Sequence, residues 1–355
     1  MAYTTIDDPS AFFQTALWTG TGGVGNAVTF DGNSDMQPDF VWSKRRDLGG
    51  RNHVLKDTST GGTSNNDQYL SSSLTAAETT YDRYRMDFNS DGFTLDGDGD
   101  TGFQGSGTSM VSWAWKANGG TTASNTDGSI TSTVQANTDA GFSIVTYGGT
   151  GSAATLGHGL ADTPDVIIFK NRDDTNVWAT YHQGIGNNEK LVLNTTAAED
   201  EDGSFMNGTL PTSSVFSVGA SVNTNGSGDN YVAYCFAEKQ GYSKFGSYVG
   251  NGSADGPFVY TGFKPAFLIM KRTDSTGNWV MFDTKRDTHN VTKHRLFPNL
   301  GNADNTTRNY IDLLSNGFKM RDTDVDHNAS AATIIYMAFA ENPFTTSTGI
   351  PATAR

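Results

Sequence analysis

The chain has little of what would tie it to several common classes of protein. It holds one cysteine in 355 residues, Cys235, which excludes an internal disulfide framework. Charged residues make up only 17% of the chain, and the net charge is −14. Nucleic acids are bound mainly through clusters of Lys and Arg. This charge balance therefore argues against a nucleic-acid partner.

Long apolar runs are also missing. No stretch approaches the roughly 20 apolar residues that a membrane-spanning helix needs. The first nine residues contain neither the basic nor the hydrophobic region of a secretory signal. We therefore expect no membrane span and no secretion by that route. Cys235 stands within a β-like run and is expected to be a small buried apolar residue.

What the chain does contain is a pattern that occurs three times. The segments Pro38–Asp47, Pro164–Asp173 and Pro265–Asp274 each open with proline, continue through β-forming residues to a lysine and end at an aspartate. Roughly 70 residues after each lysine comes an aromatic-rich run, at 111–117, 232–238 and 335–341. Internal repeats of this kind indicate a modular protein that presents a surface, and not a chain folded around one active site.

The apolar runs are short and rich in β-branched and aromatic residues, and 41 glycines supply turns between them. Asp91-Gly92 and Asn316-Gly317 stand between strand-like flanks and predict hairpins. About seven short strands per hundred residues are typical of a sandwich. The sequence therefore predicts an all-β fold of three tandem β-sandwich repeats, jelly-roll or concanavalin-like, with short terminal arms.

The boundaries follow from composition. We place an N-terminal arm at 1–15, the three repeats at 16–117, 141–239 and 240–342, and a C-terminal tail at 343–355. A Gly/Ser/Thr-rich stretch at 118–140 reads as a flexible linker. We expect the second and third repeats to pack together and the first to be more independent.

Two loops carry alternating carboxylates that could converge on calcium, which takes six to eight oxygen ligands. They are Asp96, Asp98 and Asp100 in the first repeat and Asp322, Asp324 and Asp326 in the third. An EF-hand loop would need Gly and Glu where Thr101 and Gly107 stand, so that motif fails. A solvated turn is the simpler interpretation and a calcium site is the alternative. No other cofactor is predicted.

The lysine of each copy, Lys44, Lys170 or Lys271, follows a hydrophobic run. We expect it to mark the end of a strand, and the alternative is a basic spot for an acidic glycan.

Two sets of aromatic residues have different expected roles. Those of the closing runs alternate along a strand and should share a buried face; these residues, with one methionine, are Trp113, Trp115, Tyr234, Phe236, Met337 and Phe339. Trp42, Trp178 and Trp279 are less regular, and one or two of them could stack on sugars at the surface.

Catalytic patterns are scarce. The six histidines are scattered without metal-ligand spacing, and no G-x-S-x-G motif is present. Carboxylates are plentiful enough to hide a glycosidase pair, but abundance alone is no evidence for one. We predict that the chain is not an enzyme.

Several segments together resemble a known family. Tyr231–Gly252, Asp255–Pro265, the opening Tyr3–Pro9 and the closing Ile350–Arg355 are similar to virion structural, tail-fibre-like proteins of tailed phages that infect marine bacteria. The resemblance covers nearly the whole chain and carries no catalytic residues. It implies a protein of the virion, assembled in the host cytoplasm.

The resulting expectation is a non-enzymatic tail-fibre or adsorption component that presents loops to the host surface. A capsid decoration or head-fibre protein is the alternative, and a polysaccharide depolymerase is a weaker one. Expected partners are other virion proteins, further copies of the chain, for which a trimer is the guess, and a host surface glycan or outer-membrane component. Phe12 and Phe13 are the candidates for virion attachment.

Overall fold

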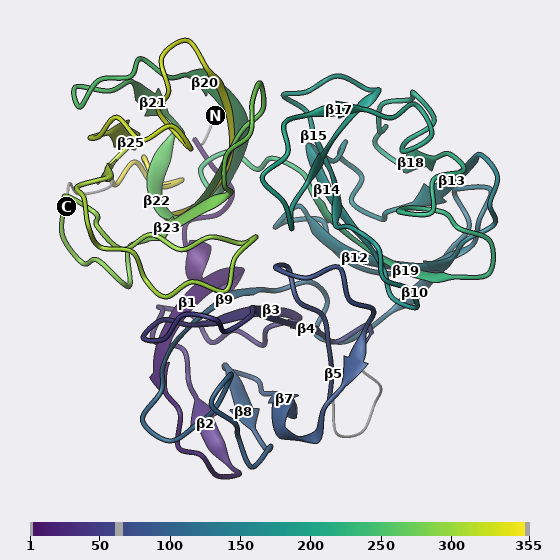
Figure 1. The fold of residues 1–355 in the computed structure, drawn as a ribbon, viewed down its shortest axis with the longest axis horizontal. Helices are drawn as coiled ribbons and strands as arrows, with labels where there is room; N and C mark the ends of the chain where they lie inside the picture. Colours follow the sequence, from purple (N-terminus) through teal and green to yellow (C-terminus); the bar gives the residue numbers. More distant parts are fainter. Residues whose placement is uncertain (1–2, 61–66, 352–355) are drawn as a thin grey trace.

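The computed structural model describes residues 3–60 and 67–351. They form β-strands in several antiparallel sheets, together with two short 3₁₀ helices, η1 (Pro9–Ala11) and η2 (Asp82–Tyr84). Within these ranges there is no α-helix, and no helix is long and apolar enough to cross a membrane. The predicted all-β class is confirmed. The strands gather into three groups around a common centre (Figure 1).

The first group holds one four-stranded sheet and two smaller ones. The four-stranded sheet has the order β1 (Phe13–Thr19), β9 (Ser109–Trp115), β3 (Phe40–Arg45) and β4 (Val54–Asp57). A three-stranded sheet contains β2 (Asn26–Val28), β8 (Phe93–Leu95) and β7 (Met86–Phe88). A short pair is formed by β5 (Gln68–Tyr69) and β6 (Thr79–Thr80). Strands β7 and β8 form the hairpin that the Asp91-Gly92 pair predicted.

The second group is built on an eight-stranded sheet. Its order is β10 (Ala123–Asn125), β11 (Ser132–Asn137), β12 (Phe142–Gly148), β19 (Asn230–Phe236), β14 (Val166–Asn171), β15 (Ala179–His182), β16 (Glu189–Val192) and β17 (Asp200–Glu201). A pair, β13 (Ala154–Gly157) and β18 (Val215–Val218), packs on it through a shared core. Strands β10 and β11 lie inside the stretch expected to be a flexible linker. That expectation was wrong, because β10 pairs with β11 and β11 pairs with β12.

The third group again holds a four-stranded and a three-stranded sheet. The larger sheet has the order β20 (Ser243–Val249), β26 (Thr333–Pro343), β22 (Phe263–Arg272) and β23 (Val280–Asp283). The smaller sheet has the order β21 (Phe258–Tyr260), β25 (Gly317–Met320) and β24 (Ile311–Leu314). Strands β24 and β25 form the hairpin expected at Asn316-Gly317.

One strand order occurs in all three groups. It is β1-β9-β3-β4 in the first, β12-β19-β14-β15 within the sheet of the second, and β20-β26-β22-β23 in the third. The registers agree as well: Phe13 lies opposite Trp115, Phe142 opposite Phe236, and Ser243 opposite Phe339. Positions in the three groups that this register aligns are called matching positions below.

The two inner strands that carry the repeated patterns in each main sheet are buried on both faces; they are β9 and β3, β19 and β14, and β26 and β22. In each group one face packs against the smaller sheets, and the other faces a central cluster shared by all three groups. At the middle of this cluster lie Trp115, Phe236 and Phe339. Their ring centroids are 6.3 Å apart for Trp115–Phe236, 5.5 Å for Trp115–Phe339 and 5.8 Å for Phe236–Phe339.

The central cluster tests two predictions, one on which residues are buried and one on how the repeats pack together. The buried role expected for the alternating residues of the closing runs is confirmed, and Cys235 is buried as predicted. The expected independence of the first repeat is wrong, because its Trp115 contacts the other two groups as closely as they contact each other.

Candidate functional site

The three groups are joined by main-chain hydrogen bonds that run in one direction around the molecule. Segments 75–78, 196–199 and 302–304, called the straps here, each reach the end of a strand in a neighbouring group. The N–H of Glu78 donates to the second group, that of Glu199 to the third, and that of Asp304 to the first; the acceptors are the carbonyls of Arg172, Thr273 and Arg46, each 2.8 Å away. These three hydrogen bonds link the first group to the second, the second to the third and the third to the first, so that the groups form a closed ring.

An indole or imidazole supports each of these junctions. Trp178 Nε1 donates to Ser71 O at 2.8 Å, and Trp279 Nε1 donates to Val192 O at 3.0 Å. At the matching position of the first group stands His53, whose Nε2 lies 2.9 Å from Phe297 O. All three side chains cross to another group.

The tautomer of His53 follows from its second contact. Its Nδ1 lies 2.8 Å from Nε1 of Trp42, which can only donate. Nδ1 therefore accepts, and Nε2 carries the proton and donates it to Phe297 O.

The three less regular tryptophans are buried. Trp42, Trp178 and Trp279 are 4%, 0% and 2% exposed. The idea that one or two of them stack on sugars at the surface was wrong: all three are buried, Trp178 and Trp279 bond to another group, and Trp42 orients His53.

The repeated lysines are also buried. Lys44, Lys170 and Lys271 are fully buried, and each ammonium donates to the carbonyl of the next residue, at 2.6, 2.7 and 2.5 Å. Burial lowers the pKa of each of these lysines to about 8. They cannot form a basic spot for an acidic glycan, and the structural interpretation of these lysines is the one that the contacts support.

His182 makes a pH-dependent contribution to the second junction. Its Nδ1 accepts the N–H of Gly184, and its Nε2 lies 3.1 Å from Tyr336 O, so the neutral ring donates to the third group. Burial lowers its pKa to about 4. The unfolded chain, with a His pKa of about 6.5, takes up a proton first as the pH falls.

We therefore expect the folded state to lose stability between pH 6.5 and pH 4, by roughly 3 kcal/mol from this residue. Urea unfolding of the wild type and of His182→Gln at pH 7 and pH 4 measures the effect. The variant keeps an amide donor without the titration, so its loss of stability on acidification should be smaller. Equal losses in both proteins would contradict the assignment.

The three junctions differ next to the ends of β4, β15 and β23. At the first, Gln135 of β11 fills the space between the first and second groups. Its Nε2 donates to Thr58 Oγ1 at 2.8 Å and to Ser59 Oγ at 2.9 Å, and its Oε1 accepts the N–H of Gly120 at 3.0 Å. At the second junction, Gln183 Nε2 donates directly to Phe245 O at 2.6 Å. In both places a glutamine carboxamide bridges two groups.

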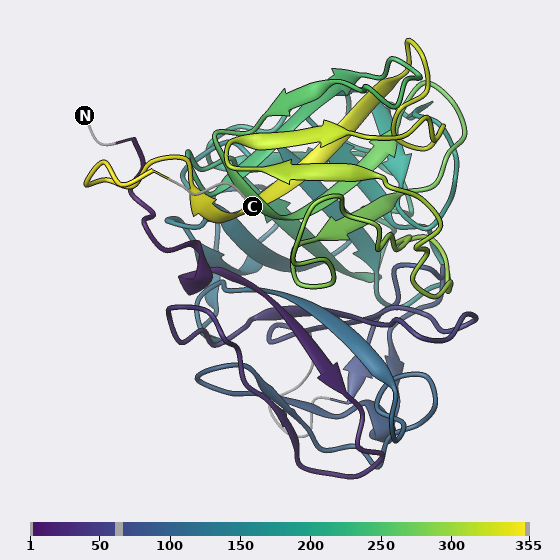
Figure 2. The same cartoon turned by 90° about the vertical axis from the view of Figure 1, so that its left-hand side faces the viewer.

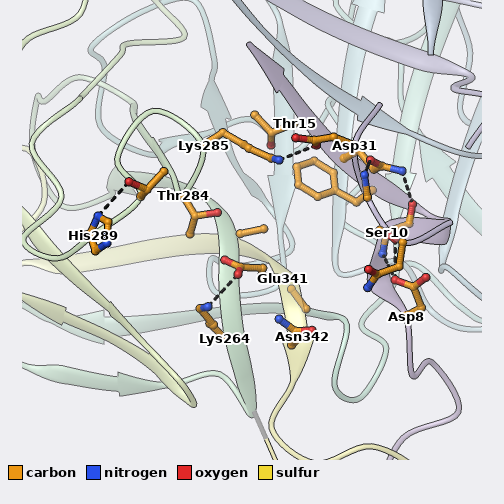
Figure 3. A pocket seen from close by; sticks show the side chains of 17 residues that line it. Asp8, Ser10, Thr15, Asp31, Lys264, Thr284, Lys285, His289, Glu341 and Asn342 are labelled. Atoms are coloured by element: carbon orange, nitrogen blue, oxygen red, sulfur yellow. Dashed lines mark hydrogen bonds and ion pairs between the residues drawn. The ribbon is translucent and has the colours of Figure 1, made fainter. Parts of the chain in front are cut away.

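At the third junction a cleft of about 540 Å³ remains (Figure 3). It lies between β1 of the first group and the ends of β22, β23 and β26 of the third. The N-terminal segment, purple in Figure 2, leads through η1 into β1, and its Asp8 and Ser10 line the cleft. The lining residues are Asp8, Ser10, Phe13, Gln14, Thr15, Asp31, Gly32, Asn33, Lys264, Ala266, Thr284, Lys285, Thr288, His289, Ala340, Glu341 and Asn342.

Charges in the cleft are arranged as pairs. Lys285 Nζ reaches across from the third group to Asp31 at 2.6 Å, and Lys264 Nζ lies 2.8 Å from Glu341 (Figure 3). Asp31 and Glu341 therefore each have an ammonium partner, whereas the third carboxylate of the lining, Asp8, accepts from the hydroxyls of Ser10 and Ser34. The hydroxyl of Thr15, a residue that is 6% exposed, has no hydrogen-bond partner among the described residues. The cleft can accept polar groups along the edge of β1.

The carboxylates predicted as calcium ligands in the first group have other partners. Asp98 pairs with Arg83 at 3.3 Å, Asp96 hydrogen-bonds to Asp87, which raises the pKa of Asp87, and Asp100 accepts backbone N–H groups of the following turn.

The acidic loop of the third group is likewise engaged. Asp322 lies 2.9 Å from His327, Asp324 lies 2.8 Å from Arg295, and Asp326 accepts a backbone N–H. Within residues 3–60 and 67–351, no group of three or more His, Cys, Asp or Glu side chains could hold a metal ion. Calcium binding stays a prediction that these contacts do not favour.

The phenylalanines expected to attach the chain to the virion lie at the start of β1. Phe13 is 3% exposed and stacks on Phe339 with a centroid distance of 5.4 Å. Its ring belongs to the central cluster and is not free for a partner, which corrects that part of the expectation and the placing of residue 13 in an arm. Phe12 is partly buried against Tyr242, and its role in attachment stays a prediction.

Sequence reasoning missed the residues that distinguish the junctions. Composition puts Gln135 in a predicted linker, and no sequence pattern singles out Gln183 or Thr284. The signal was present: Thr58, Gln183 and Thr284 each follow directly on the end of the strand next to the shared lysine-bearing strand. Without the register, however, their side chains could not be compared.

A family model matches residues 8–343, and its description is Domain of unknown function (DUF7483). No curated protein matches the chain. No solved structure matches it either.

Proposed function

The chain belongs to the DUF7483 family, and we propose that it is a non-enzymatic structural protein of a phage virion, acting in the tail fibre or in adsorption. The observation that carries the proposal is the closed ring of three sheet groups. The strap hydrogen bonds, repeated at all three junctions around a central aromatic cluster, support a rigid body whose loops point outward. Loops on a rigid scaffold are the usual place for binding residues.

We further propose that the three groups are copies of one β-sandwich unit of jelly-roll or concanavalin-like type, arranged about an approximate threefold axis. The shared strand order, the shared register and the cyclic strap contacts support this. Three copies of one unit place weak sites at fixed spacing, and such multivalency raises overall affinity by about 10²–10⁴-fold without better individual contacts.

The proposed partners are other virion proteins and a host surface glycan or outer-membrane component. The surfaces that join the three groups are buried within one chain, so further copies of the chain would associate through other faces. A homotrimer would then present nine units instead of three.

A capsid decoration or head-fibre protein is the second candidate. One observation favours it: a body with three like groups about an axis can meet a threefold-symmetric partner through three similar contacts at once. A depolymerase has no comparable support, because the cleft carboxylates Asp31 and Glu341 are each paired with a lysine.

The location of the protein in purified virions tests the proposal. We expect cryo-electron microscopy, with antibody labelling of the chain, to place it on the tail or its fibres. Labelling on the capsid lattice would replace adsorption with decoration. Purified particles that lack the chain altogether would overturn the virion assignment.

A further inference from the structure

We propose that the cleft between the first and third groups binds an extended strand of another polypeptide, which adds to the outer edge of β1. The inference rests on the geometry of the three junctions and does not depend on a role in the virion. It commits to a peptide strand as the occupant, and a small carbohydrate is an outcome that the test distinguishes.

The edge of β1 that lines the cleft is available for pairing. β1 is the last strand of its sheet, and among the described residues no strand pairs with its outer side. The N–H of Lys116, just past β9, donates to Phe12 O, so the backbone of Phe12 faces β9. Because backbone directions alternate along a strand, the N–H and C=O groups of Phe13, Thr15 and Leu17 face outward. An unpaired edge of this kind is a template for another strand.

The chain itself shows a strand in the matching place. In the second group, β12 stands where β1 stands in the first, and its outer edge is paired with β11. Ile144 lies opposite Gln135 in that pair. The register places Thr15 at the position of Ile144. The side chain of Gln135 then enters the junction and bonds to Thr58 and its neighbours.

The second junction fills the same place in another way. Phe245 of β20 is at the position that matches Thr15 and Ile144, and its carbonyl accepts a hydrogen bond from the carboxamide of Gln183. At the third junction, Thr284 stands where Gln183 stands: Gln183 N donates to Asp165 O, and Thr284 N donates to Ala266 O. Threonine is too short to reach across as glutamine does. Two junctions therefore have a carboxamide at this spot, and the third has the cleft.

The chemistry of the occupant follows from β11. Five residues of β11 pair with β12, so a segment of that length fits the edge. Its central residue would carry a carboxamide that lies against Thr284, as Gln135 lies against Thr58. The outward N–H and C=O groups of Phe13, Thr15 and Leu17 recur at every second residue, as do the N–H and C=O groups that an added strand would turn toward them. The ion pairs of the cleft, Lys285–Asp31 and Lys264–Glu341, favour polar side chains at the two ends of the bound segment.

Amide hydrogen exchange on the full chain, followed by mass spectrometry, tests the inference. The probe is a synthetic peptide with the sequence of residues 131–138, Thr-Ser-Thr-Val-Gln-Ala-Asn-Thr, at millimolar concentration. We expect exchange in residues 13–17 to slow several-fold and in proportion to peptide concentration. A peptide with proline in place of the glutamine lacks the central N–H and the carboxamide, and should give no slowing.

Two substitutions provide matched controls. Thr284→Gln should close the cleft as Gln183 closes the second junction, and should abolish the slowing while the thermal unfolding temperature stays the same or rises. Gln183→Thr should open a second cleft and add protection of residues 243–249. The proposal is overturned if the wild type shows no slowing at residues 13–17, if Thr284→Gln responds as the wild type does, or if a neutral disaccharide gives the same protection as the peptide.

Discussion

Replacing Arg286 with leucine should lower the free energy of unfolding by about 3–5 kcal/mol, because it leaves the buried carboxylate of Asp283 without its cation. The Arg286 side chain is fully buried. It bonds to Asp283 at 2.5 Å and to Asp304 at 2.8 Å. Asp283 is itself fully buried and also accepts Trp113 Nε1 at 3.0 Å. The carboxylate that Arg286 neutralises therefore joins the first and third groups.

Urea unfolding of the wild type and of Arg286→Leu measures this effect. Arg321→Leu is the matched control: Arg321 pairs with Asp312 at 3.3 Å, but its side chain is 41% exposed. Exposed ion pairs contribute about 0–1 kcal/mol, so the control should unfold almost as the wild type does. Similar losses in the two variants would show that the buried network is not a special contributor to stability.

Truncating Trp279 to alanine should also lower the free energy of unfolding by about 3–5 kcal/mol, through lost burial and the cavity left behind. Trp279 is 2% exposed in the central cluster, and its Nε1 donates to Val192 O of the second group. The substitution removes both the packing and the hydrogen bond at one junction. Because the cluster is common to all three groups, we expect the chain to unfold in a single transition.

Chemical denaturation followed by tryptophan fluorescence and by circular dichroism tests both statements. Phe258→Ala is the control for loss of an aromatic ring, since Phe258 is 47% exposed and its removal should change stability by less than about 0.5 kcal/mol. Two separate transitions in the wild type would contradict a shared core. A small effect of Trp279→Ala would show that the second and third groups hold together without this contact.

Sequence patterns were reliable where the information is local. Alternation of apolar residues over five to seven positions identified the buried faces of the closing strands, because side chains in a strand point to opposite sides. Asp-Gly and Asn-Gly located two hairpins, although the turns differ from two-residue Asp-Gly and Asn-Gly reversals: residues 89–92 form the first loop, and Ser315 and Asn316 form the second. Composition favoured turns and short strands, and so the all-β class.

The errors arose where a contact joins residues far apart in the chain. Polar composition suggested a flexible linker at 118–140, yet β11 pairs with β12 and Gln135 bridges two groups. The tryptophans looked irregular in sequence because His53 stands in place of a third one, and only the junction hydrogen bonds show that His53, Trp178 and Trp279 match. The candidate cleft could not be found from the sequence at all.

The sequence by itself determined that the chain is built of short strands, that one pattern occurs three times, and that the aromatic residues of the closing runs are buried. These properties depend on residue type and on spacing along one strand. The tertiary structure alone decided how the three groups close into a ring, why the lysines and tryptophans are buried, and where a cleft remains. The ring closes because backbone groups far apart in the chain meet at each junction. The cleft remains because Thr284 at the third junction has a shorter side chain than Gln183, which fills the same place at the second.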